Sequence, residues 1–489
     1  MFERDAPARP PIRGGRAVHF QKLRRSRKRS VRTVFLPLVA CAMAALTSSL
    51  TRTVHASDTP KTPTQLDTPV VIPKQLSLED ALTLFRQHGF DLLIADANIM
   101  SAEADIKIAG AIPNPSVNGA VGKVFNYDPK DYAPSGPSCV GCSNIPWTVG
   151  FSDGSALADS LSGKRGLRLQ VAKKALEAAR MTKLDAQRNL EFQVKAQYAV
   201  VAFTRAAVDF ARDVQATNLK SLELNTTRFE KGAIDEGTLE RVRTAKLEAD
   251  QQVDMALGSL RQSQLGLAYL LGVRAMVPDF EVDPTLMKGF TVPPSLLDAD
   301  EPSLEQIALT HRADYLAVGL LRQRAEAEIT LAKRLKFPDF ALSVQYSQTG
   351  TGQNAIQPPT LMFGITVPLP IFYEYQGEIR KGEADYILQS VVQAKVQAQV
   401  FADVGNGYAA YVAARKLVER MESGGLLAAA KKARDITELQ FKAGNVPLMD
   451  FLDAQRTYIA INLEYLQDLT SYWTAVFQLE QATGTELRK

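Results

Sequence analysis

The sequence predicts a mainly α-helical protein with a small β part, built from two copies of one structural unit. Three observations lead to this prediction: an internal repeat, long proline-free segments with coiled-coil spacing, and two pairs of strands with alternating polarity. Repeats of this kind indicate a unit that was duplicated in the gene and packs against its own copy. The chain has 489 residues, which is enough for two or three ordinary domains.

The repeat consists of short matches that occur in the same order in both halves of the chain. The matching pairs of segments are 77–79 with 303–305 at an offset of 226, 102–106 with 325–329 at an offset of 223, and 228–232 with 440–444 at an offset of 212. The offset shrinks along the chain, as small insertions would cause. We therefore expect two structural repeats joined by a linker.

This organisation predicts five segments. They are a signal peptide at 1–56, a Pro/Thr-rich linker at 57–75, a first repeat at 76–275, an inter-repeat linker at 276–301, and a second repeat at 302–489. In each repeat we expect one helical segment (about 77–111 and 303–336), opened by Ser77 or Ser303 as a cap. A strand pair and two long helices separated by a glycine turn should follow.

Long helices are expected because no proline occurs between residues 147 and 277 or between 371 and 446. An unbroken helix over 166–227 would span about 90 Å at 1.5 Å per residue. Apolar residues within the predicted long helices recur with a period close to 3.5, which is typical of a coiled-coil seam. The two seams are Val242, Ala249, Val253, Ala256, Leu260, Leu267 and Leu271, then Leu452, Ile459, Leu463, Leu466, Trp473 and Phe477.

The predicted strands alternate between an apolar face and a small or polar face. The apolar residues are Val117, Val121, Phe125, Trp147, Val149 and Phe151 in the first pair, and Phe340, Leu342, Val344, Tyr346, Leu361, Phe363, Ile365, Val367 and Leu369 in the second. Such alternation suits a lipid-facing barrel strand. Four strands cannot close a barrel, and open strand edges are not tolerated in a bilayer. Several chains would therefore have to share one transmembrane β-barrel.

The N-terminus reads as an export signal. Residues 22–32 hold seven Lys/Arg and precede a short apolar run that is too short to span a membrane. Residues 1–56 contribute +10 to the net charge of +4, so the rest of the chain carries −6, which argues against a nucleic-acid-binding protein. Cleavage after Ala56 is the preferred alternative, and a lipobox ending at Cys41, which would be lipidated, is the other.

Candidate reactive residues are few. The chain has four histidines, two of them in the leader, and no phosphate loop, nucleophile elbow or HExxH motif. We therefore expect no catalytic residue, no cofactor and no metal site. Cys139 and Cys142 fall between the first two strands, where a loop disulfide is favoured and a surface metal contact is the alternative.

Residues 440–484 carry a recognisable pattern: an aromatic-x-x-Gly turn, Leu452-Asp453-Ala454-Gln455-Arg456, and a long helix ending Leu479-Glu480-Gln481-Ala482-Thr483-Gly484. Together with residues 363–372, this segment resembles the TolC-like outer-membrane factor (outer membrane efflux protein) family over about 75–484. Gly163-Lys164-Arg165 with Arg168, and the segment 375–379, are similar to the CzcC-like cation-efflux branch of that family.

The resemblance implies a homotrimer with a twelve-stranded barrel in the outer membrane and a long coiled-coil-like α-helical tunnel in the periplasm. It implies a passive export duct for heavy-metal cations or drugs, with a periplasmic adaptor and an inner-membrane pump of the RND type as partners. Asp450 and Asp453 would line the closed entrance, although Asp450 could also be an ordinary helix-start residue.

The same resemblance places adaptor docking at the turns that contain Phe229 and Gly232, and Phe441 and Gly444. Two other protein classes share some of these features. A periplasmic adaptor would have one helical hairpin between β-rich halves, and an exported coiled-coil scaffold would lack lipid-facing strands. Neither class explains a duplicated helix, hairpin and helix plan.

Overall fold

The computed structural model describes residues 70–125, 145–349 and 357–487. All described residues belong to one compact unit. The predicted signal peptide, Cys41, Cys139 and Cys142 lie outside the described residues. Among the described helices, none combines the length and apolar character needed to cross a membrane.

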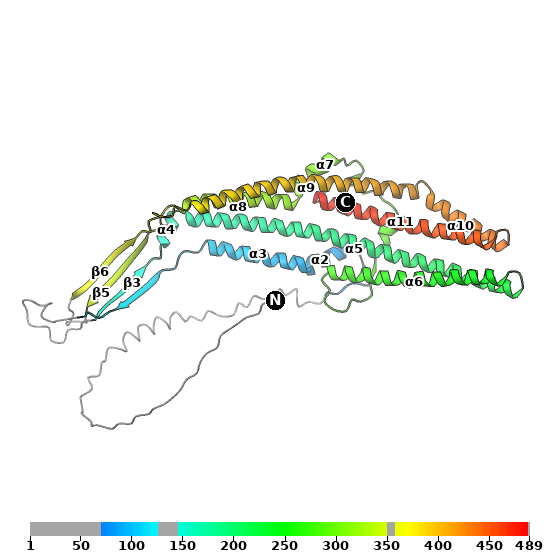
Figure 1. Cartoon of the computed structure of the whole chain (residues 1–489), viewed down its shortest axis with the longest axis horizontal. Coiled ribbons are helices and arrows are strands. Elements are labelled where there is room, and N and C mark those ends of the chain that lie inside the picture. Colours follow the sequence, from blue (N-terminus) through cyan, green and yellow to red (C-terminus); the bar gives the residue numbers. More distant parts are fainter. Residues whose placement is uncertain (1–69, 126–144, 350–356, 488–489) are drawn as a thin grey trace, which may run out of the picture. The chain divides into compact units, whose positions relative to one another are not determined.

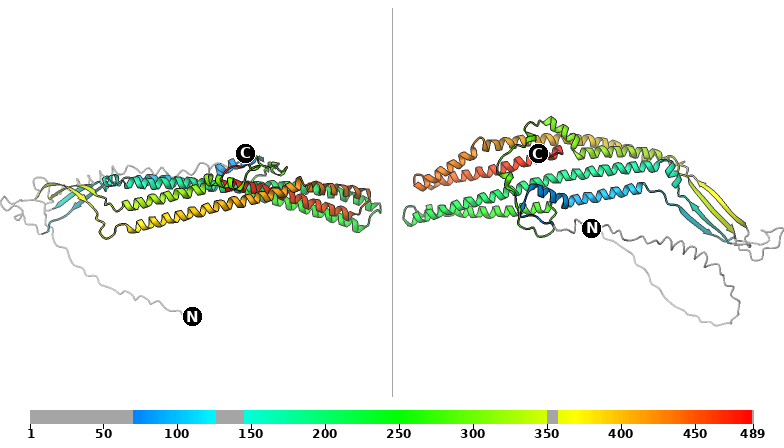
Figure 2. Two further views of the ribbon diagram at one scale, coloured as in Figure 1. Left: turned by 90° about the horizontal axis from the view of Figure 1, so that it is seen from above. Right: turned by 180° about the vertical axis from the view of Figure 1, so that it is seen from behind.

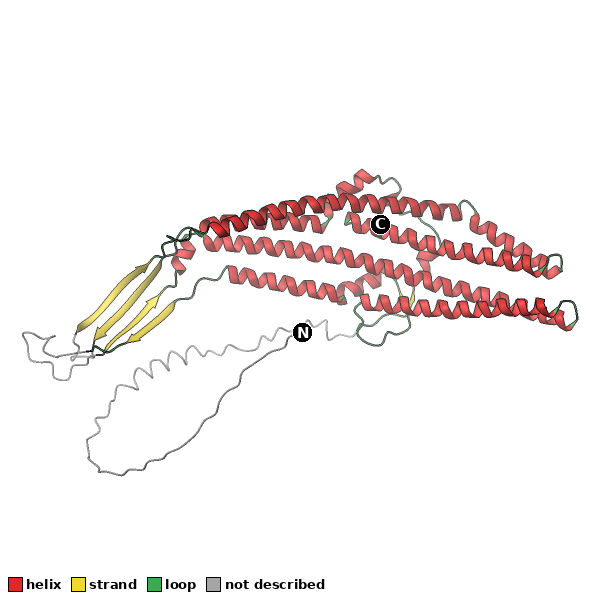
Figure 3. Cartoon of the chain, viewed as in Figure 1, coloured by secondary structure: helices red, strands yellow, loops and turns green. Residues whose placement is uncertain are grey.

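Helices make up most of the described chain (Figures 1 and 3). In order they are α2 (Leu78–His88), α3 (Phe90–Ala109), α4 (Ala156–Leu161), α5 (Lys164–Glu230), α6 (Glu236–Leu270), α7 (Glu301–His311), α8 (Ala313–Arg334), α9 (Gln376–Glu422), α10 (Leu426–Ala443) and α11 (Leu448–Thr483), with short 3₁₀ helices η2 (Pro284–Met287) and η3 (Pro294–Leu296). The helix α5 runs without a break over 67 residues.

The two predicted leading helices are wrong as single segments, because each is broken near its first third. The backbone is extended at Gly89 between α2 and α3, and at Arg312 between α7 and α8. A Cβ atom at Gly89 would collide with Phe85, so this bend requires glycine. Ser77 caps α2 by accepting from the Asp80 amide at 3.1 Å, but Asp300 and not Ser303 is the N-cap of α7.

The second long limb is also interrupted, between α9 and α10. Gly425 precedes α10 with a φ of +72°, a conformation that disfavours side chains with a Cβ atom. The α6 seam was predicted correctly: six of its seven residues are buried. On α11 the prediction was wrong near the start, because Leu463 is exposed and the buried residues there are Leu448, Phe451 and Gln455.

Short strands tie the two linker regions together. β1 (Gln75–Leu76) pairs in parallel with β4 (Glu281–Val282). The hydroxyl of Tyr198, on α5, donates to the Leu76 carbonyl at 2.9 Å and accepts from the Asp283 amide at 3.0 Å. This buried tyrosine fixes the small sheet to the middle of α5. The main hydrophobic core lies around it, where α5, α9 and α11 pack with α2, α7 and η2.

The larger sheet has four antiparallel strands in the order β2-β3-β5-β6. The strands are β2 (Ser116–Val121), β3 (Pro146–Ser152), β5 (Ala341–Thr349) and β6 (Gln357–Thr366). Four residues predicted in strands lie beyond the strand ends: Phe125, Phe340, Val367 and Leu369. Paired residues form rows across the sheet. One row is Val117, Phe151, Val344 and Phe363, and another is Val149, Tyr346 and Leu361.

All of these apolar residues but Tyr346 are exposed, and they share one face of the sheet. The alternate rows hold small or polar residues with the exception of Met362: Ser116, Ser152, Ser343 and Gly364, then Asn118, Gly150, Gln345 and Met362. The predicted split into an apolar face and a small or polar face is confirmed. Within the described residues, β2 and β6 have no strand on their outer sides.

Candidate functional site

Two helical turns lie at the same end of the helices in Figures 1 and 2, one joining α5 to α6 and the other joining α10 to α11. Gly232 and Gly444 have φ values of +68° and +79°. The amide of Ala233 donates to the Arg228 carbonyl at 2.8 Å, and the amide of Asn445 donates to the Gln440 carbonyl at 2.9 Å. These bonds satisfy carbonyl groups that a helix end leaves free, so both turns are tight and ordered.

The two aromatic residues of these turns differ in their surroundings. Phe441 is buried against Phe451, with ring centroids 5.4 Å apart and planes 3° from parallel. Val242 on α6 and Leu448 complete this small core. Phe229 is exposed on α5. Because the side chain of Phe441 is covered within the chain, only Phe229 offers an aromatic surface at the turns.

Arg228 connects the two turns. Its guanidinium donates to the Lys442 carbonyl at 2.8 Å and to the Phe441 carbonyl at 3.4 Å, and it lies over the Phe441 ring. These carbonyls belong to the last turn of α10, where the helix dipole favours a positive charge. The sequence did not single out Arg228, because the repeat places Gln440 at the matching position and the arginine therefore carries no repeated signal.

A pair of buried amides links α5 to α11 near these turns. The side-chain nitrogen of Gln455 donates to the side-chain oxygen of Asn218 at 3.2 Å. The side-chain oxygen of Gln455 has no hydrogen-bond partner among the described residues. The same is true of the side-chain oxygen of Asn225, a buried residue seven positions after Asn218 on α5. A polar seam between two apolar helices fixes register and is weaker than an apolar one.

Asp450 and Asp453 lie on the first two turns of α11, next to the glycine turn. Both side chains are exposed, and neither forms an ion pair or side-chain hydrogen bond within the described part of the chain. Asp450 does not cap the helix, whose N-cap is Pro447. Further along α11, Glu464 and Asp468 are also unpaired in the described residues. Burial, and then the nearby Glu464, raise the pKa of Asp468.

In the first turn, the acidic residue Asp235 has a structural task. Its carboxylate accepts from the Thr238 amide at 3.0 Å and caps α6. Hydrogen bonding from Thr238 lowers the pKa of Asp235. Within the described residues, Asp235 is thus a capping residue, whereas Asp450 and Asp453 on α11 have no such task.

A polar cluster joins the strands to the helices at the other end of α5. Arg168 donates two 2.7 Å hydrogen bonds to the carboxylate of Asp159, which is buried. This pairing raises the pKa of Arg168. Lys164 is also buried and donates to Asp339 at 2.8 Å and to the Phe337 carbonyl at 2.6 Å. The Gly163-Lys164-Arg165 motif thus holds the start of α5 against the segment that leads into β5.

The second motif, 375–379, opens α9 in a comparable place. The hydroxyl of Tyr373 donates to Glu378 at 2.6 Å and accepts from the Gly377 amide at 3.0 Å. A Cβ atom at residue 377 would displace that hydroxyl from its bond to the Gly377 amide. Both motifs therefore make contacts that hold the start of a long helix in place.

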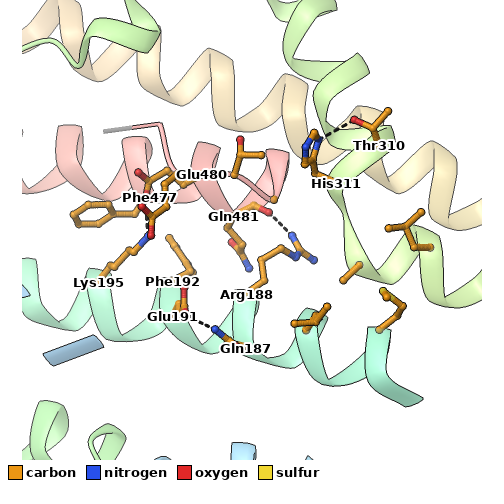
Figure 4. Close-up of a pocket in the computed structure, with 17 residues that line it drawn as sticks. Gln187, Arg188, Glu191, Phe192, Lys195, Thr310, His311, Phe477, Glu480 and Gln481 are labelled. Carbon is orange, nitrogen blue, oxygen red and sulfur yellow. Dashed lines mark hydrogen bonds and ion pairs between the residues drawn. The ribbon is translucent and has the colours of Figure 1, made fainter. Parts of the chain in front are cut away.

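A cavity of about 440 Å³ lies where α11 ends between α5, α7 and α8 (Figure 4). Buried Lys195 pairs with buried Glu480 at 2.7 Å, and Glu480 also accepts from the Leu487 amide at 3.0 Å. Arg188 donates to the Gln481 carbonyl, and Thr310 contacts the His311 ring. Because Lys195 and Glu480 pair with each other, we interpret this cavity as a packing site between helices and not as a binding site.

The described residues contain no group of three or more His, Cys, Asp or Glu side chains that could hold a metal ion. Comparison with known proteins adds to this description. A family model described as "Outer membrane efflux protein" matches residues 304–485. The "Cobalt-zinc-cadmium resistance protein CzcC" of Cupriavidus metallidurans is 22% identical over 466 residues, which cover 93% of this chain and all of that protein.

Solved structures are similar in fold. A structure of CusC has a TM-score of 0.65 with 17% identity, covering 83% of this chain and 92% of the other. The outer membrane protein VceC of Vibrio cholerae has a TM-score of 0.62 with 19% identity, covering 84% of this chain and 96% of the other. Both alignments include more than the matched segment of the family model, so the fold agreement extends into the first half of the chain.

Proposed function

Because its sequence and its fold are similar to those of outer membrane efflux proteins, we propose that the chain is the channel of a tripartite efflux system, a passive duct. The protein is located in the outer membrane, with its helical part in the periplasm. It is a transport duct and not an enzyme. The observation that carries the proposal is a four-stranded sheet whose two faces differ in polarity, one of them apolar and exposed, joined to very long helices.

The active form in this proposal is a homotrimer. One chain supplies four strands, and the outer edges of β2 and β6 are free within the described residues. A bilayer does not tolerate free strand edges, so β6 of one copy would pair with β2 of the next. Three copies give a twelve-stranded barrel whose apolar face meets lipid and whose small or polar face lines the lumen. The order of helices and strands in the two halves supports the two-repeat division at 276–301.

The periplasmic mouth lies at the two turns in this proposal. Exposed Phe229 and the turn at Gly232 form the surface that a periplasmic adaptor would contact, and an inner-membrane pump of the RND type would supply the energy. The turn at Gly444 takes part through its backbone, since Phe441 is buried. Three copies would bring six carboxylates of Asp450 and Asp453 to the mouth, where they would attract cations.

Divalent metal cations are the substrate class that we propose. The similar protein of Cupriavidus metallidurans is a cobalt-zinc-cadmium resistance protein, and α11 carries unpaired carboxylates at the mouth and further along the helix. Loss of the gene tests this substrate class. If the substrate is drug-like instead, the loss would sensitise cells to drugs and leave tolerance of cobalt, zinc and cadmium unchanged.

The channel itself is tested with the purified full chain. We expect it in the outer-membrane fraction as an oligomer that runs as a trimer on unheated gels and as a monomer after boiling. Reconstituted in planar bilayers, it should conduct ions. A monomeric periplasmic protein without conductance would contradict the proposal.

A further inference from the structure

Four links join the larger sheet to the helices, and all four lie at the same end of the sheet (Figures 1 and 3). Each link carries at least one large apolar side chain that is exposed. The links and these residues are 110–115 with Ile112, 153–163 with Leu157 and Leu161, 335–340 with Phe337, and 367–375 with Leu369, Ile371 and Phe372. A single exposed apolar residue is ordinary, but apolar residues gathered in one region mark a contact surface.

The link from β6 to α9 continues the apolar face of the sheet. Val367 and Leu369 follow Ile365 at alternate positions, which places them on the same side of an extended chain. Proline residues alternate with them and favour that extended conformation. Phe372, three residues further on, is fully exposed. The apolar surface therefore extends past Thr366, where the strand ends.

The link from β3 to α5 contains α4, which presents an apolar side. Leu157 and Leu161 are four residues apart and therefore neighbours on that helix, and they are 45% and 72% exposed. Asp159 lies between them in the sequence but is buried, and its carboxylate accepts both hydrogen bonds from Arg168. α4 thus places its acid inside the protein and its leucines outside, which is the reverse of the usual arrangement in water.

Polar contacts tie the four links into one surface, which we call the collar. Two of these contacts start from neighbouring residues at the beginning of α5, and the third joins the link before β5 to the link after β6. They are Arg165 Nε to the Gly110 carbonyl at 2.8 Å, Lys164 Nζ to the Phe337 carbonyl at 2.6 Å, and Lys336 Nζ to the Glu374 carboxylate at 4.0 Å. The apolar residues of the four links therefore belong to one continuous region of the surface.

The charges around the collar leave cations unpaired. Each acid of the collar has a partner within the described residues: Asp153 has the Leu342 amide, Asp159 has Arg168, Asp339 has Lys164 and Glu374 has Lys336. Arg334 at the end of α8 and Arg380 near the start of α9 are exposed, and neither forms an ion pair within the described residues. The guanidinium carbon of Arg334 lies 5.4 Å from the centre of the Phe337 ring. The collar thus presents apolar groups with free cations beside them.

This combination matches the interfacial zone of a phospholipid bilayer. Apolar side chains enter the boundary of the acyl chains, and arginine side chains reach the phosphate groups while their apolar stems stay along the membrane. Phosphate groups attract cations at this level of a membrane. A free anion would account for the arginines and leave the apolar residues unexplained.

We propose that the collar binds phospholipids of the inner leaflet of the outer membrane, with Leu161 and Phe372 at the boundary of the acyl chains and Arg334 and Arg380 at the phosphates. The inference rests on the proposed function, which places the apolar face of the sheet against lipid. It extends that contact beyond the strands, so that α4 and the start of α9 belong to the membrane contact as well.

The test measures the depth of spin labels in the full-length protein, reconstituted in vesicles of phosphatidylethanolamine and phosphatidylglycerol. Cys139 and Cys142 are replaced by serine, and Cys41 offers no free thiol whether the leader is removed or the thiol is lipidated. Labels on Leu161→Cys and on Phe372→Cys should collide more with oxygen, which concentrates in lipid, than with a water-soluble nickel chelate.

Two reference labels bracket the result. Phe363→Cys on β6 should report lipid, and Met276→Cys, 90% exposed in the linker after α6, should report water. Collar labels that report water while Phe363→Cys reports lipid would overturn this inference and leave the proposed channel intact. Collar labels shielded from both reagents would also overturn it, because a neighbouring copy would then cover the collar. A Phe363→Cys label that reports water would overturn the proposed function itself.

The two arginines are tested by lipid binding to the detergent-solubilised protein. Arg334→Gln with Arg380→Gln should bind phosphatidylglycerol about tenfold more weakly than the parent, as measured by native mass spectrometry. Lys431→Gln with Lys432→Gln removes the same charge from exposed residues of α10 and should bind as the parent does. Equal binding by both double variants would overturn the placement of phosphate groups at the collar.

Discussion

The guanidinium carbon of Arg228 lies 5.2 Å from the centre of the Phe441 ring, and the same side chain donates a hydrogen bond to the Lys442 carbonyl. One residue at the end of α5 thus holds the end of α10, 214 residues later in the chain. The second link between these helix pairs, from Asn218 to Gln455, is a single amide bond. These polar links add to the small apolar core in which Val242 of α6 packs with Phe441, Leu448 and Phe451.

The first prediction concerns this link. Arg228→Ala removes the bonds to α10 and the contact with Phe441, and should weaken the link between the two turns by about 2 kcal/mol. We expect single-channel recordings to show a higher open probability than the parent shows. Arg241→Ala, which removes an exposed arginine of α6 near the same turn, is the matched control and should behave as the parent. Equal open probability in both variants would mean that Arg228 is only a surface contact.

The second prediction compares two aromatic residues. Phe451→Ala empties the core beneath the α10–α11 turn and should cost about 3–5 kcal/mol in the stability of that turn. Protease cleavage between α10 and α11 should become faster as a result. Phe229→Ala removes an exposed ring and should leave cleavage unchanged, while adaptor binding should weaken. If Phe229→Ala binds the adaptor as the parent does, the docking surface lies elsewhere.

The third prediction concerns the buried pair of Lys195 and Glu480. Lys195→Met leaves an unpaired carboxylate in the core and should destabilise the protein by about 3–5 kcal/mol. Lys195→Met with Glu480→Met removes both charges and should recover part of the loss, although the Leu487 amide then loses its acceptor. Thermal unfolding followed by circular dichroism measures both variants. Purely additive losses would show that the two side chains are not coupled.

The periodic parts of the fold could be predicted from the sequence. Alternating polarity identified the faces of β5 and β6, and the absence of proline identified α5. Both signals depend only on residues that are close together in the sequence. The breaks at Gly89 and Arg312 were missed, since a bend can be stabilised by distant residues. Arg312 shows this: its guanidinium bonds to Asp314 and to Asp403, 91 residues away.

The candidate site divides in the same way. The glycine turns carry a local signal, and Gly232 and Gly444 do adopt left-handed conformations. The burial of Phe441 and the exposure of Phe229 could not be predicted, because the repeat gives both residues the same local sequence context. What separates them is Phe451, which stacks on Phe441, because the equivalent position of the first repeat is occupied by Leu239 and not by an aromatic residue.

The last prediction concerns Asp450 and Asp453. If three copies bring six carboxylates to a narrow mouth, their combined field should bind polyvalent cations. Replacing both residues by alanine should leave folding unchanged, because both are exposed and neither has a partner in the described residues. It should abolish the block of single-channel current by polyvalent cations added on the periplasmic side, and it should weaken the preference for cations. Glu464→Ala with Asp468→Ala removes the same charge further along α11 and should retain the block. A double variant of Asp450 and Asp453 that is blocked as the parent is would show that the two residues only begin the helix, and Glu236 and Glu240 of the other turn would then be the next candidates.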